Sequence, residues 1–152
     1  MSSLNGQCKD DSSDGCSNNK KKYSCFKPVV GEVAGTLASV SANTTVRLPL
    51  NFRLFRTSKV RINEDGGIRV EEDGEYFVAF SAVFPNNIFG VVFSVYSPDF
   101  SGTAITGNGA TVFSELVCLE KGDTVYVTVT TGITPILAPG IAGILTVVKV
   151  ED

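Results

Sequence analysis

The sequence predicts an all-β domain, a two-sheet sandwich or jelly roll. Roughly eight or nine short segments have the pattern of strands, and turn signals separate them at fairly regular intervals. No segment shows the 3.6-residue period of a helix. The composition agrees, because the chain contains 15 glycines and much Val and Thr but few strong helix formers.

The expected strands follow one another from residue 29 onward. Glycine and acidic residues mark turns between them, for instance at 64–67 and 71–74. Segment 124–130 alternates strictly between Val and Thr or Tyr, as a half-buried strand does. The predicted strand segments are 29–40, 44–50, 59–63, 68–70, 75–84, 90–96, 111–119, 124–130 and 143–150.

Two of these segments, 75–84 and 90–96, are apolar on both faces. A single sandwich core covers one face of each sheet, so the surplus apolar positions predict an interface with another chain. The residues expected in this interface are Phe80, Phe84, Phe93 and Tyr96.

Two loops are unusually apolar for segments that join strands, since surface loops are normally polar. We expect a neighbouring subunit to cover them. The residues concerned are Ile88 and Phe89 in the first loop and Ile136, Leu137 and Ile141 in the second.

Residues 1–28 are expected to form a polar connector tail, and residues 29–152 the jelly-roll domain. Up to residue 22 the tail is Ser, Asn, Asp, Gly and Lys with almost nothing apolar, so it cannot build a core of its own. The tail carries Cys8, Cys16 and Cys25, whose wide spacing lacks the close Cys pair of a zinc site. We expect inter-chain disulfides from these three, with intra-chain bridges or free thiols as alternatives. Cys118, within a strand segment, is expected to be a small core residue.

The chain contains no histidine. It therefore lacks the commonest general base, the commonest metal ligand and the partner of every Ser–His or Cys–His nucleophile. The sequence predicts no catalytic residue, no cofactor, no metal site and no enzymatic activity. The acidic turns at 64–65 and 71–73 could hold calcium, although a solvated turn is the simpler interpretation.

Charge and hydropathy exclude two further classes of partner. Six basic residues lie between 47 and 69, but the net charge is −3 and the sequence pI is about 5.0, unlike a nucleic-acid-binding domain. We expect acidic side chains within or between subunits to neutralise the basic stretch. No signal peptide and no apolar stretch of bilayer length is found, so no membrane insertion is expected.

Three sequence segments, referred to as phrases, occur in the order expected of a known family. They are IRVEEDGEYFVAFS at 68–81, VCLEKGDTVYV at 117–127 and AGILTVVKV at 142–150. Together they resemble the jelly roll shared by tumour necrosis factor and the globular head of complement. The nearest likeness is to bacterial domains at the ends of collagen-like spore-surface glycoproteins and to exosporium basal-layer proteins. The resemblance covers residues 45–152, and the chain departs from the glycoproteins in having no collagen Gly-X-Y run.

The resemblance implies a compact homotrimer whose three inner sheets pack around an axis. It also implies that the first phrase crosses between the sheets, that the second forms a hairpin, and that the last strand lies in the middle of the inner sheet.

We therefore expect a structural subunit that assembles with itself, as an exosporium component or appendage fibre at the spore surface. Other spore-surface proteins are further candidate partners. Such proteins are made in the mother cell without a signal peptide and meet oxidising conditions after lysis, which fits the four cysteines. Two alternatives stay open: a receptor- or carbohydrate-binding head at a fibre tip, and a phage virion protein.

Overall fold

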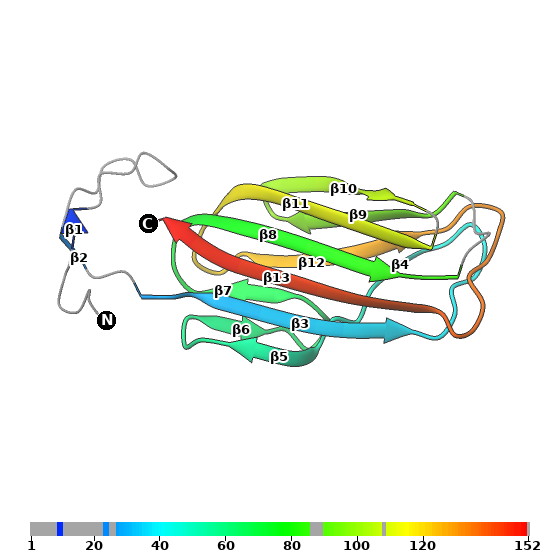
Figure 1. Cartoon of the computed structure of the whole chain (residues 1–152), viewed down its shortest axis with the longest axis horizontal. Helices are drawn as coiled ribbons and strands as arrows, with labels where there is room; N and C mark the ends of the chain where they lie inside the picture. Colours follow the sequence, from blue (N-terminus) through cyan, green and yellow to red (C-terminus); the bar gives the residue numbers. More distant parts are fainter. Residues whose placement is uncertain (1–8, 11–22, 25–26, 86–89, 108, 152) are drawn as a thin grey trace.

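The computed structural model describes residues 9–10, 23–24, 27–85, 90–107 and 109–151. In these residues the chain is all-β, and the two antiparallel sheets of the main body pack face to face (Figure 1). A separate pair joins β1 (Lys9–Asp10) to β2 (Tyr23–Ser24). The predicted fold class is confirmed.

The first sheet contains the longest strands of the molecule. Its order places the C-terminal strand β13 in the middle, between β3 and β8. Across the sheet the strands are β5 (Phe52–Arg56), β3 (Val30–Leu37), β13 (Ile141–Glu151), β8 (Gly74–Val83) and β11 (Ala110–Leu119).

The second sheet is centred on β12, which pairs with β9 on one side and with β4 and β7 on the other. Strand β10 joins the two sheets, because its first part pairs with β9 and its last two residues pair with β11. The strands are β10 (Phe100–Thr106), β9 (Val92–Ser97), β12 (Thr124–Thr130), β4 (Thr45–Arg47), β7 (Ile68–Val70) and β6 (Val60–Ile62).

Alternation along the strands builds the core. In β12 the valines at 125, 127 and 129 are fully buried, while the Thr and Tyr residues between them face outward. In β8 the buried side chains are those of Tyr76, Val78, Phe80 and Ala82. The two sheets meet through aromatic contacts, since the Phe93 ring lies 5.7 Å from that of Phe80.

Of the three strand arrangements that the family resemblance implies, two are confirmed and one is wrong. The turn at 71–73 crosses from β7 in the second sheet to β8 in the first, and β13 lies within the first sheet. The turn at 120–123 does not close a hairpin. Among the described strands, β11 pairs with β8 and β10 whereas β12 pairs with β9, β4 and β7, so this turn also crosses between the sheets.

The acidic turn at 71–73 is not simply solvated. The carboxylate of Glu71 lies 3.0 Å and 3.4 Å from the Nε atoms of Arg61 and Arg69, as ion pairs without the alignment of hydrogen bonds. Asp73 Oδ1 accepts a hydrogen bond of 2.8 Å from the Lys121 amide. Glu71 and Asp73 thus contact different partners. In the described part of the chain, no three metal-ligating side chains gather at one place. That part also contains no helix that could cross a membrane.

Candidate self-association surface

The outer faces of the two sheets differ sharply in chemistry. The outer face of the second sheet carries hydroxyl groups from β9 and β12, with Tyr96 stacked on Tyr126 at 5.4 Å. The guanidinium of Arg47 lies 4.0 Å from the Tyr126 ring centre, and its Nη2 atom donates to the Gly66 carbonyl. Such a face is suited to contact with water.

The outer face of the first sheet is apolar. Eight of the twelve large hydrophobic side chains exposed in the described residues lie on it, so exposure of this kind is concentrated on one face. They are Phe52, Phe55, Phe77, Val83, Val112, Leu116, Ile144 and Val150.

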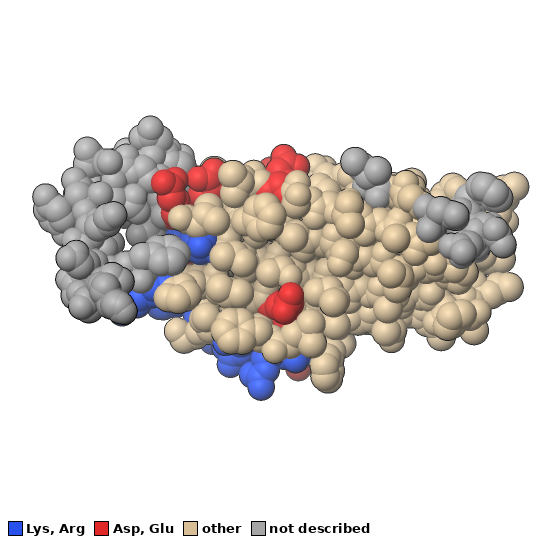
Figure 2. Space-filling model, in the orientation of Figure 1, with Lys and Arg blue, Asp and Glu red and all other residues tan. Residues whose placement is uncertain are grey.

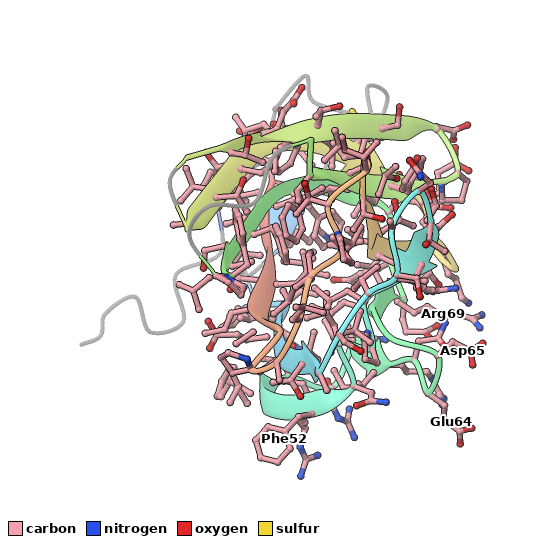
Figure 3. The ribbon with its side chains drawn as sticks, turned by 90° about the vertical axis from the view of Figure 1, so that its right-hand side faces the viewer. Phe52, Glu64, Asp65 and Arg69 are labelled. Atoms are coloured by element: carbon pink, nitrogen blue, oxygen red, sulfur yellow. The ribbon has the colours of Figure 1, made fainter. Side chains whose placement is uncertain are left out.

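Strand register shows that this surface is continuous from edge to edge. One cross-strand row runs from Phe52 through Ala34, Ile144 and Ser81 to Val112, one residue from each of the five strands. Paired residues project to the same side of a sheet. A shallow hollow of about 670 Å³ lies over the β8–β11 side of this row. At the β5 edge the Phe52 ring extends away from the ribbon (Figure 3).

Charge is scarce in the middle of this surface. Glu32 is half-buried there and accepts a hydrogen bond of 2.9 Å from the Thr146 hydroxyl. Figure 2 shows the view over β3, β13 and β8 as mostly uncharged, with one acidic group in the middle of the face. The other acidic side chains gather at the upper left, and the basic ones lie at the left end and along the lower edge.

The residues predicted for the subunit interface do not form this surface. Phe80, Phe84 and Phe93 are buried in the chain's own core, with exposures of 2%, 8% and 0%. Tyr96 lies on the outer face of the second sheet. The outward-facing positions of β8 instead carry Phe77 and Val83. The prediction of a second apolar face was right for this strand, but the residues assigned to it were those of the core face.

The apolar loop at 133–141 divides between core and surface. Ile136 and Ile141 are buried, and Ile136 exchanges two backbone hydrogen bonds with Val40. These two residues therefore cannot contact a neighbouring subunit. Leu137 remains 65% exposed and stays a candidate for such a contact. Ile133 of the same loop was not among the predicted residues, but it is 83% exposed.

Several predicted positions fall outside the described residues. They are Ile88 and Phe89 of the other apolar loop, and Cys8, Cys16 and Cys25 of the tail. The expectation for Cys118 is corrected: it is exposed on the outer side of β11 rather than buried in the core, because its neighbours Val117 and Leu119 take the inward positions. Cys118 is not a free thiol.

No protein-family model and no curated protein matches the chain. Several solved structures, in contrast, match the chain. The globular domain of zebrafish complement 1qA protein matches with a TM-score of 0.64 at 13% identity, over 83% of this chain and 100% of that one. The chain has the jelly-roll fold of complement and tumour necrosis factor heads.

Three further solved structures share this jelly roll. PRD1 vertex protein P5 matches with a TM-score of 0.63 at 11% identity, over 81% of this chain and 97% of that one. Murine APRIL gives 0.58 at 18% identity, covering 82% and 100%. Eiger TNF from S. frugiperda gives 0.55 at 13% identity, covering 84% and 95%.

Proposed function

We propose that the chain is a structural head that associates with two further copies of itself through the outer face of its first sheet. The observation that carries this proposal is the concentration of exposed apolar side chains on that face. A monomer that stays soluble rarely leaves a contiguous apolar patch of this kind uncovered. The number of subunits rests on the resemblance to trimeric jelly-roll heads.

The size of the surface agrees with a subunit interface. Five strands spaced by about 4.8 Å, each contributing about eight residues at about 3.3 Å, span roughly 600 Å². A stable interface buries about 800 Å² per partner, so the sheet face supplies most of the area and its edges can supply the rest. The hollow on this face is shallow, whereas a small ligand normally binds in a concave pocket that encloses most of its surface.

The proposed setting is the surface of a bacterial spore, where heads would build an exosporium layer or an appendage. The three sequence phrases at 68–81, 117–127 and 142–150 support this setting. Residues 1–28 would link one head to the next, with inter-chain disulfides through Cys8, Cys16 and Cys25.

The test is the mass of the purified protein in solution. At micromolar concentration, light scattering should give three times the chain mass of 16.1 kDa. Leu116→Asp or Val112→Asp should give soluble monomer, because each places an unpaired charge within a buried interface. Thr128→Asp, on the polar face of the second sheet, is the matched control and should remain trimeric. A monomeric wild-type protein would contradict the proposal.

A virion protein is the second candidate function, and the likeness to PRD1 vertex protein P5 favours it. Antibody against the head distinguishes the two settings. Labelling of the spore surface supports the first candidate, whereas labelling of phage particles with unlabelled spores supports the second.

A further inference from the structure

A groove lined by arginines lies at the β5 edge of the first sheet. Two adjoining hollows, of about 550 Å³ and 330 Å³, share Arg53, Arg56 and Arg61. The other lining residues are Thr57, Ser58, Asn51 and Ile62, so no carboxylate lines either hollow. We refer to this site as the arginine groove.

A β-bulge creates this concentration of charge. Phe55 pairs with Glu32 and Arg53 with Val33, which leaves Leu54 as the extra residue of β5. The bulge puts Phe52 and Phe55 on the outer face of the sheet and Arg53 and Arg56 together on the opposite side. Arg56 is held in place there, because its Nη1 atom donates to the Val60 carbonyl at 3.0 Å.

A second hollow, of about 410 Å³, lies at the opposite edge of the same sheet. Its lining contains four exposed carboxylates, and no Lys or Arg belongs to the lining among the described residues. Phe100 and Leu116 supply apolar surface beside the carboxylates. The acidic residues are Asp73, Asp99, Glu115 and Glu120, and we refer to this site as the acidic groove.

The two grooves lie at the same level of the sheet. Arg56 pairs with Gly31, Gly31 with Val147, Val147 with Val78, and Val78 with Glu115. One cross-strand row therefore begins at the arginine groove and ends at the acidic groove. Four strand spacings separate its ends by about 20 Å, so these charges do not pair within one subunit.

Two different patches that complement each other on one chain define a heterologous contact, and such a contact closes into a ring when the rotation between subunits closes. The apolar face lies between the two grooves. If three copies turn that face toward a common axis, the β5 edge of one copy comes to the β11 edge of the next. Because both grooves lie at one level, the basic and acidic groups meet without a shift along the axis.

We propose that the arginine groove of each subunit receives the acidic groove of the next copy of the chain, with Arg53 and Arg56 facing Glu115 and Asp99. This inference rests on the proposed trimer. It names the contact that fixes the register between neighbouring subunits and the handedness of the ring. Guanidinium groups suit the task, since their planar donors match carboxylates in pairs. Complementary charges at an interface chiefly fix its orientation and exclude wrong partners.

Charge reversal in the full-length protein tests this pairing. Sedimentation measures the protein concentration at which half of the trimer has dissociated. Glu115→Arg and Arg53→Glu should each raise that concentration at least about tenfold, because each puts like charges face to face. The double variant, Glu115→Arg with Arg53→Glu, should bring the dissociation concentration most of the way back to that of the wild type. Glu64→Arg makes the same change of charge at an exposed turn (Figure 3) and should dissociate like the wild type.

The outcomes separate this inference from the trimer itself. If wild-type protein is trimeric but the single reversals dissociate like Glu64→Arg, the pairing is wrong and the trimer stands. A double variant no tighter than the single ones also contradicts the pairing. If inorganic sulfate stabilises the wild type but not Arg53→Glu, and both remain equally trimeric, the groove holds an anion instead. A wild-type monomer overturns the trimer and the pairing together.

Discussion

The Nζ atom of Lys149 lies 3.1 Å from Oε2 of Glu72, and this ion pair ties the last strand to the turn that crosses between the sheets. Only 5% of the Lys149 side chain is exposed, against 36% of Glu72. A buried cation depends on the carboxylate beside it, because little water can take the partner's place. The pair therefore joins the middle of the first sheet to the start of β8.

Loss of this carboxylate should weaken the fold. Glu72→Gln is expected to lower the free energy of unfolding by about 1–2 kcal/mol, between the values for an exposed and a buried ion pair. Urea denaturation of the variant measures the change. Glu64→Gln, on an exposed turn, is the control and should leave the midpoint in place. Equal midpoints for the two variants would show that Lys149 does not depend on Glu72.

Gly35 is required where β3 passes beneath the segment that leads into β5. A Cβ atom at this position would collide with the carbonyl oxygen of Pro49 and lie 2.9 Å from the Cα of Leu50. These are backbone atoms, and neighbouring Leu50 is fully buried, so the obstacle cannot rotate away.

Gly35→Ala should therefore lower the free energy of unfolding by about 2–3 kcal/mol, as overpacking of a core does. Gly107→Ala is the matched control, since its nearest neighbour would be the Ala110 carbonyl at an ordinary 3.4 Å. Thermal unfolding followed by circular dichroism compares the two. A Gly35→Ala protein as stable as the Gly107→Ala protein would mean that the Pro49–Leu50 backbone yields easily.

Two substitutions separate the core from the association surface. Phe93 is fully buried and contacts the rings of Phe80 and Phe84, so Phe93→Asp should prevent folding and give insoluble protein. Phe77 is 38% exposed on the outer face, so Phe77→Asp should fold and lose only self-association. Solubility, circular dichroism and mass measure these outcomes. A soluble monomer from Phe93→Asp, with the strand signal of the wild type, would contradict the assignment of that residue to the core.

Strands with strict alternation were predicted from the sequence almost to the residue. The bounds of β7 and β12 agree with the predicted segments, because a buried Val or Ile alternates there with a polar or charged side chain. Four of the described strands were not predicted: the two-residue strands β1 and β2 of the tail, and β5 and β10 of the main body. The bulge at Leu54 gives β5 a period of three in place of two, and the small residues of β10 carry no alternation at all.

The association surface itself was predicted only in part. Apolar residues at both the odd- and the even-numbered positions of β8 correctly indicated a second apolar face. The sequence of the strand does not say, however, which of the two sets faces the other sheet. Phe80 faces inward because Phe93 lies opposite it on β9, a contact between strands that are not neighbours in a sheet. The two charged grooves depend on strand register across five strands, which no local pattern encodes.

The tail is expected to build assemblies from complete heads. Deleting residues 1–26 removes all three tail cysteines and leaves Val29, which is buried and accepts the Lys149 amide hydrogen bond at 2.8 Å. The truncated protein should therefore fold and form trimers but no fibres or layers in electron micrographs.

A full-length variant without the three tail cysteines isolates the covalent part of this role. Changing Cys8, Cys16 and Cys25 to Ser should leave the assemblies visible but make them dissociate in denaturant without reductant, since only non-covalent contacts would remain. If the truncated protein forms the same fibres as the full chain, the heads alone carry the contacts that extend the assembly, and the tail has no part in it.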